Sequence, residues 1–271
     1  MPGSDATLQA TMAGLETGLR VRHITTYELD TCDPDSDIRA VLADPQKADY
    51  DCIPVRSNGV IVRYVWRSEG GDGKVSEHMK PISEAMLVSA DLPLTSFVPV
   101  IGHTSHRLVL DGMSIRGIVT WSDLQKPPVR LYVFALVNHL EQLMAEVITA
   151  HCPSNDAWLA HLSNAHKAAV RKFFNRFRAE RLDPPMLEFT TFVQKSLIIA
   201  SLLNLSHQQL GEFDEIRTGL RNVVSHAGTY AGSGAAVKDF ARRLQLAQDW
   251  IARLPGFLPN VSTRGNERAV E

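Results

Sequence analysis

Residues 108–124 read LVLDGMSIRGIVTWSDL, and this stretch decides the fold of the first half of the chain. Residues 108–110 are a short apolar run, Asp111-Gly112 is a turn signal, and residues 115–121 form a second, β-branched run. Two such runs around a glycine-bearing turn predict a β-hairpin. The hairpin is followed directly by the polar residues Ser122-Asp123.

A second hairpin is predicted earlier in the chain. Residues 52–55 (CIPV) and 60–66 (VIVRYVW) flank the turn Ser57-Asn58-Gly59. Short helices are expected over residues 36–42 and 82–86. The first half therefore combines short strands with short helices, which is an α+β pattern.

The two hairpins belong to an internal repeat. Segments 20–69 and 73–125 have the same internal order, in which a strand that ends in an acidic turn is followed by a hairpin. The acidic turns are Asp33-Pro34-Asp35 and Asp91-Leu92-Pro93. This order predicts a tandem pair of β-α-β-β units.

The second half shows a different pattern. From Pro128 onward, apolar residues recur every three to four positions, as amphipathic helices require. The spacing predicts helices over residues 128–150, 154–182, 186–204, 211–227 and 234–254. The expected domains are a flexible segment 1–19, a paired α+β module 20–127, an all-α bundle 128–258 and a flexible tail 259–271.

Charge, cysteine spacing and apolar stretches argue against a disulfide-rich, zinc-binding, secreted or membrane-spanning protein. The chain has 28 basic and 30 acidic residues; 13 basic and 19 acidic ones lie in residues 1–150, so the positive excess lies in the second half. Three widely spaced cysteines suggest neither a disulfide framework nor a zinc site. The N-terminus lacks the pattern of a secretory signal, and the most apolar stretch, residues 197–205, is about half the length of a membrane span. We expect a cytoplasmic protein without a membrane partner.

The segment Gly117-Ile118-Val119-Thr120-Trp121-Ser122-Asp123-Leu124 resembles the last strand and following helix start of a cystathionine-β-synthase (CBS) domain. The resemblance implies a regulatory adenine nucleotide, AMP, ADP or ATP, with Asp123 on the ribose hydroxyls and Thr120 and Ser122 near phosphate. A carboxylate can accept both hydrogens of a ribose diol. The alternative is that Ser122 or Asp123 only caps a helix that begins at Leu124.

The first repeat departs from this motif. Arg63 stands where the glycine would be, Trp66 where the threonine would be, and Glu69 where the aspartate would be. An indole in place of a small hydroxyl could stack on a base, but more often it fills a cleft. We therefore expect one nucleotide per chain.

In the second half, Leu220-Arg221-Asn222-Val223-Val224-Ser225-His226 resembles the signature of the HEPN family (higher eukaryotes and prokaryotes nucleotide-binding). The resemblance implies metal-independent RNA cleavage. His226 would move protons, since its unperturbed pKa lies nearest neutrality. Arg221 would hold the charged phosphate with its bidentate fork, and Asn222 could position either one.

Arg221 and His226 would not share a face of a continuous helix, because five residues separate them by roughly 140°. Either the helix ends near Ser225, or a second copy completes the site, which implies a symmetric homodimer. In the alternative, Arg221 pairs with Asp214 or Glu215, His226 favours the helix C-terminus by its charge, and the bundle only dimerises.

Other features carry weaker signals. The expected helix 154–182 is rich in lysine and arginine, which suits either RNA or a solvated face. The histidines at 151, 161 and 166 lack metal-ligand spacing, so no metal is expected. The function expected is a nucleotide-sensing CBS module that controls a HEPN-type endoribonuclease; the alternative is a non-catalytic nucleotide-binding dimerisation protein.

Overall fold

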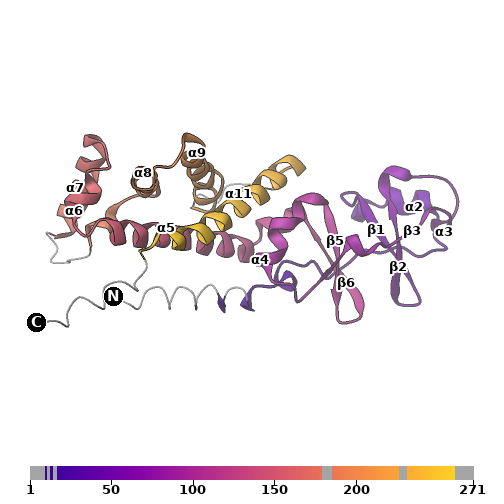
Figure 1. Ribbon diagram of the computed structural model, residues 1–271. Helices are drawn as coiled ribbons and strands as arrows, with labels where there is room; N and C mark the ends of the chain where they lie inside the picture. Colours follow the sequence, from indigo (N-terminus) through magenta and orange to yellow (C-terminus); the bar gives the residue numbers. More distant parts are fainter. Residues whose placement is uncertain (1–9, 11–12, 15–16, 179–184, 226–230, 260–271) are drawn as a thin grey trace, which may run out of the picture. The chain divides into compact units, whose positions relative to one another are not determined.

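The computed structural model describes the chain except for residues 1–9, 11–12, 15–16, 179–184, 226–230 and 260–271 (Figure 1). The chain forms two compact units. One is Ala13–Val129 with Ala231–Lys238, and it contains all the strands of the described residues. The other consists of the described parts of Arg130–Tyr230 and Asp239–Glu271, and its described elements are helices. The predicted α+β class and the helical C-terminal region are confirmed.

The strand-bearing unit has two three-stranded sheets, ordered β1-β2-β3 and β4-β5-β6. Both predicted hairpins are present as antiparallel pairs. In the first, Asn58 and Gly59 have φ angles of 50° and 81°, which a two-residue turn needs at both central positions. The strands are β1 Cys52–Ser57, β2 Val60–Trp66, β3 Lys80–Pro81, β4 Leu87–Ser89, β5 His106–Asp111 and β6 Ser114–Thr120.

The helices of this unit are short. They are α2 Ile38–Ala43, α3 Val75–His78 and α4 Leu94–Phe97, with 3-10 turns η1 Val21–His23, η2 Pro45–Lys47, η3 Arg67–Glu69, η4 Glu84–Met86, η5 Val98–His103 and η6 Trp121–Gln125. The helix predicted at 36–42 begins at Ile38, because Asp37 accepts a hydrogen bond from the Arg39 amide and caps it. The segment predicted as a helix at 82–86 is only the 3-10 turn η4.

The two repeats exchange their first segments. Thr26, at the start of the first repeat, forms an antiparallel bridge with Ile118 of β6, in the second repeat. Reciprocally, Lys80 of β3, in the second repeat, pairs with Tyr64 of β2, in the first. Each last strand is therefore covered by a segment of the other repeat, and the two repeats form one body.

Gly117 is required by this exchange. A Cβ atom at this position would lie 2.9 Å from the Thr26 carbonyl oxygen and closer still to the Thr25 side chain. Side chains essentially never approach a backbone oxygen that closely, so only glycine lets the crossing segment pair with β6. At the corresponding position of β2, Arg63 pairs with Pro81.

The helical unit differs from prediction mainly at helix breaks. Its elements are α5 Pro127–His151, α6 Asn155–Leu159, α7 Asn164–Arg178, η7 Met186–Phe189, α8 Phe192–Leu202, α9 His207–Ile216, a π-helical turn η8 Arg217–Arg221, α10 Asn222–Ser225, α11 Gly234–Arg253 and η9 Leu254–Phe257. The single helix expected over 154–182 is interrupted. Ser154 caps α6, and the Ser163 hydroxyl accepts a hydrogen bond from the His166 amide at the start of a second helix, α7. Thr191 likewise begins α8 with a capping box to Gln194. The helix expected from residue 211 begins at His207, after Ser206, which forms a capping box with Gln209.

Aromatic side chains of three helices meet in the core of the helical unit. The rings of Phe213 and Trp250 lie 4.5 Å apart, and Phe192 packs edge-on against Phe213. Trp250 is buried, and its indole nitrogen donates to Glu212 at 2.9 Å. This satisfies the polar atom that burying a tryptophan would otherwise leave unpaired.

Helix α5 is the one described helix that is long and apolar enough to cross a membrane by length and composition. Half of its apolar window is buried inside the structure. Its buried residues recur at helical spacing, as in the central helix of a bundle. Core helices of soluble proteins pass the same test of length and composition, so passing it is weak evidence for a membrane span.

Candidate functional site

A cleft of about 240 Å³ lies in the strand-bearing unit, where the starts of β1 and β5 meet the end of β6. Two of the three residues predicted to contact a ligand, Thr120 and Ser122, line it. The third, Asp123, is not among the lining residues. The full lining is Asp49, Tyr50, Asp51, Cys52, Ser105, His106, Ile118, Thr120, Trp121 and Ser122.

Asp123 is buried behind the cleft and forms a capping box with Thr120 at the start of η6. One carboxylate oxygen accepts from the backbone amide of Thr120 at 2.6 Å and from its hydroxyl at 3.0 Å. The other accepts from the Lys126 ammonium at 2.7 Å and from the Thr26 hydroxyl at 3.4 Å. The helix thus begins at Trp121 with Thr120 as its N-cap, three residues before Leu124, where the sequence alternative placed a helix start capped by Ser122 or Asp123. A contact of Asp123 with a ribose stays a prediction.

Lys126 extends this network. Its ammonium also donates to the carbonyl oxygen of Ile24 at 2.6 Å. Lys126 is the single residue between η6 and α5. Lys126 thus connects Asp123, which bonds to the last residue of β6, to the first residue of α5.

His106, the first residue of β5, brings an unpaired polar atom to the wall of the cleft. Its side chain is only 7% exposed, and its Nε2 atom has no hydrogen-bond partner among the described residues. Its Nδ1 atom lies 3.2 Å from the Ser105 hydroxyl. A buried polar atom without a partner costs free energy unless a ligand or water meets it. His106 therefore brings an unpaired, buried ring nitrogen to the wall of the cleft.

The charge state of His106 follows from its surroundings. Burial lowers the pKa of the imidazole, and the nearby Arg107 guanidinium lowers it further, whereas Asp51 raises it. The net direction is downward, so the ring is neutral at pH 7. A neutral imidazole offers one donor and one acceptor to a ligand.

This shift predicts that acid weakens the fold. Below the unfolded-state pKa of about 6.5, the unfolded chain binds a proton that the folded chain excludes, so the free energy of unfolding falls as the pH falls, by at most about 1.4 kcal/mol per pH unit for one proton. Urea unfolding between pH 7.5 and 5 measures the slope. His106→Gln should flatten it, and an unchanged slope in that variant would contradict the assignment.

Cys52, which also lines the cleft, is not a nucleophile. Burial raises the pKa of its thiol to about 12, so the reactive thiolate is absent near neutral pH. Burial also raises the pKa of the Cys32 thiol, to about 11. All three cysteines are free and buried.

In the first repeat, Trp66 occupies the position that corresponds to Thr120, and its ring packs against other aromatic rings. The Trp66 ring packs edge-on against His106 at 5.3 Å and against Tyr64 at 5.5 Å. Glu69, which replaces the motif aspartate, forms an ion pair with Lys80. That a chain takes one nucleotide stays a prediction.

In the helical unit, Arg221 is the last residue of the π-helical turn. Its Nε atom lies 3.5 Å from one oxygen of Glu141, and the Lys195 ammonium lies 3.3 Å from the other. The partners considered from sequence, Asp214 and Glu215, are paired with Arg217 and Arg242 instead. Glu141 therefore joins Arg221 to the buried Lys195.

Of the other two motif residues, the structure describes Asn222 but not His226. Asn222 is the half-buried first residue of α10, which ends at Ser225. His226 lies outside the described residues, so its distance from Arg221 and the completion of the site by a second copy stay predictions. Glu141 and Lys195 also line a cavity of about 720 Å³ between α5 and the segment that leads into α8.

Two further sequence predictions concern charge. The basic side chains of α7 that were predicted to face RNA or solvent are largely exposed, and Arg171 lies 3.8 Å from Asp156. Contact with RNA stays a prediction. Within the described ranges, no group of three or more His, Cys, Asp or Glu side chains could hold a metal ion.

No protein-family model and no curated protein sequence matches the chain. Solved structures of CBS domains align with less than half of it. One is the CBS domain of a bacterial CNNM/CorC family Mg²⁺ transporter in complex with ATP, with a TM-score of 0.35, 19% identity, and coverage of 46% of this chain and 96% of that one. Another is CBSX2 in complex with AMP, with a TM-score of 0.36, 16% identity, and coverage of 42% and 99%. A third, from a CBS domain-containing membrane protein of Sphaerobacter thermophilus, has a TM-score of 0.35, 15% identity, and coverage of 45% and 94%.

Proposed function

We propose that the strand-bearing unit is a CBS-type regulatory module that binds an adenine nucleotide in the cleft at the end of β6. The observation that carries this proposal is the buried, unpartnered Nε2 atom of His106 in a cleft that Thr120 and Ser122 also line. The Gly117 to Leu124 motif and the exchanged repeats support it independently.

The cleft suits a small nucleotide. Its volume of about 240 Å³ lies just below the usual range for small-molecule sites, about 300 to 1,000 Å³. His106, Thr120 and Ser122 supply neutral hydrogen-bonding groups, whereas the carboxylates of Asp49 and Asp51 lie at its exposed rim. We therefore expect the phosphate at the end lined by Thr120 and Ser122, away from those carboxylates.

Titration calorimetry with AMP, ADP and ATP tests the proposal. We expect binding of at least one of them, and weaker binding by Ser122→Ala, because an exposed hydroxyl that bonds phosphate contributes about 0.5–1.5 kcal/mol. The matched control is Ser68→Ala, since Ser68 follows Trp66 in the first repeat as Ser122 follows Thr120 in the second, and it does not line the cleft. The proposal is rejected if the wild type binds none of the three nucleotides, or if Ser122→Ala and Ser68→Ala lose the same amount of nucleotide affinity.

We propose that the helical unit is the output, a HEPN-type, metal-independent endoribonuclease acting as a homodimer. Arg221 would stabilise the charge that develops on the phosphate, His226 would transfer the protons, and Asn222 would position one of them. The ligand would act through Asp123 and Lys126, because these residues connect the end of β6 to the start of α5. Such control requires that the nucleotide bind two states of the dimer unequally.

A second candidate function is favoured by the surroundings of Arg221. Its ion pair with Glu141, which also holds the buried Lys195, is a contact that a purely structural arginine would make. In that case the helical unit is a non-catalytic dimerisation module under nucleotide control. RNA cleavage assays separate the two candidates.

A further inference from the structure

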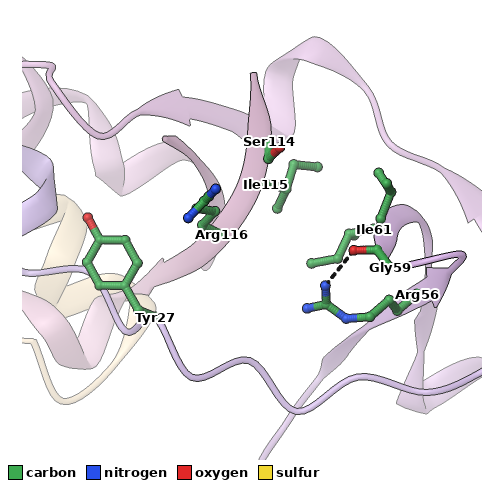
Figure 2. Close-up of a pocket in the computed structure, with 8 residues that line it drawn as sticks. Tyr27, Arg56, Gly59, Ile61, Ser114, Ile115 and Arg116 are labelled. Carbon is green, nitrogen blue, oxygen red and sulfur yellow. Dashed lines mark hydrogen bonds between the residues drawn. The ribbon is translucent and has the colours of Figure 1, made fainter. Parts of the chain in front are cut away.

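A second cavity, of about 390 Å³, lies at the other end of the hairpins of the strand-bearing unit (Figure 2). Arg56 reaches it from β1, and Ser114 and Arg116 reach it from β6, with Ile61 and Ile115 between them and Tyr27 at one side (Figure 2). The two arginines therefore belong to different repeats and approach the cavity from opposite sides.

The charge of this cavity is uncompensated. Two guanidinium groups line it, and no acidic residue does. Arg116 makes no hydrogen bond or ion pair with any residue that the structure describes. Arg56 donates only to neutral oxygens, the Gly59 carbonyl at 3.0 Å and the Thr31 hydroxyl at 3.4 Å.

Several other cations of the same unit do have acidic partners, although Arg20, Arg67 and Arg107 bond to backbone carbonyl oxygens instead. Arg22 is paired with Asp91, Lys74 with Asp35, and Lys126 with Asp123. Two like charges that share a cavity without a counter-charge destabilise each other. An anion that contacts both would remove this repulsion, and guanidinium forks match phosphate oxygens in geometry.

We propose that this arginine cavity binds a polyphosphate chain, with Arg56 and Arg116 on different phosphate groups. Two cationic groups on opposite sides fit a ligand with at least two charged phosphates better than a single phosphate. The Ser114 hydroxyl supplies a further donor at the cavity wall.

The arginine cavity is distinct from the cleft at the end of β6. Arg116 and Thr120 are four residues apart on one strand, which corresponds to about 13 Å. The two cavities share no lining residue. The proposal therefore does not depend on nucleotide binding by the cleft, and the phosphate chain could be inorganic or part of a nucleotide.

Titration calorimetry of the full chain with pyrophosphate and with tripolyphosphate tests the proposal. We expect Arg116→Gln to weaken binding about tenfold or more, the loss of a charge-assisted hydrogen bond. This side chain is exposed, so the variant should fold as the wild type does. The matched control is Arg39→Gln, an exposed arginine of the same unit that is already paired with Asp72, and it should bind normally. Equal affinities of Arg116→Gln and wild type, or no binding by wild type, would overturn the proposal.

A second comparison identifies the source of the phosphate chain. If the cavity takes a nucleotide's chain, Arg116→Gln should weaken ATP more than AMP. If it takes inorganic polyphosphate, the variant should lose tripolyphosphate while ATP and AMP are unaffected. Ser122→Ala should leave pyrophosphate binding intact in either case, so failure of the nucleotide cleft and failure of the arginine cavity give different results.

Discussion

Replacing His226 with alanine is expected to lower the rate of RNA cleavage by about 10² to 10⁴-fold, the usual contribution of a group that transfers a proton in the transition state. Arg221→Ala should lower the rate by about 10² to 10³-fold, because the charge on the phosphorus loses its fixed cation. A fluorescent RNA cleavage assay at neutral pH, with and without AMP or ATP, measures both effects. Cleavage should persist in EDTA and leave a 2′,3′-cyclic phosphate, as attack by the neighbouring hydroxyl requires.

The matched control for Arg221→Ala is Arg217→Ala. Arg217 begins the same π-helical turn and is likewise partly exposed, but it is paired with Asp214 on the preceding turn. The Arg217→Ala variant should cleave RNA at the wild-type rate. If wild type cleaves no RNA under any nucleotide condition, while Arg221→Ala melts at a lower temperature or loses dimerisation, the non-catalytic candidate holds instead.

The hairpins could be predicted from sequence because their signals are local. The Asn58-Gly59 turn and the β-branched runs on either side of it specify a hairpin without any long-range contact. Helix boundaries were predicted less well. In the segment expected as one helix over 154–182, Ser163 starts a second helix, and nothing in the apolar spacing marks that break.

The cleft was predicted only in part because it is assembled from distant segments. Thr120 and Ser122 could be found from the motif at the end of β6. His106 lies opposite Thr120 in the β5–β6 hairpin, and residues 49–52, at the start of β1, come from the other repeat. A signal for His106 existed, since it lies two residues before the predicted strand at 108–110. Its importance depends on burial and on an unpaired ring nitrogen, neither of which a single sequence reports.

The ion pair between Arg221 and Glu141 was not predicted, because its two residues are also far apart in the sequence. Helical periodicity predicts partners on the preceding turns of the same helix, which are Asp214 and Glu215. Glu141 lies 80 residues earlier, on α5, and contacts Arg221 only because the two helices meet in the folded unit. Long-range ion pairs of this kind cannot be derived from helical periodicity.

The second large effect is expected from Asp123→Ala. The variant loses the capping box with Thr120 and the ion pair with Lys126. Loss of a cap costs about 0.5–2 kcal/mol, and the partly buried ion pair adds to this. A contact with the ribose, if made, would add about 1.5–3 kcal/mol to the loss of binding. Urea unfolding should show lower stability, and calorimetry should show nucleotide affinity lowered by more than tenfold.

Asp123→Asn separates the structural role from ligand contact. The amide oxygen can still accept from the Thr120 amide, so the cap largely remains, but the charge that attracts Lys126 and would hold a ribose diol is gone. The matched control is Glu69→Ala, which removes the equivalent carboxylate of the first repeat and only an exposed ion pair with Lys80. If Asp123→Asn binds nucleotide as tightly as wild type, Asp123 acts only in the capping box of η6. If it binds less tightly at equal stability while Glu69→Ala binds normally, the carboxylate contacts the ligand.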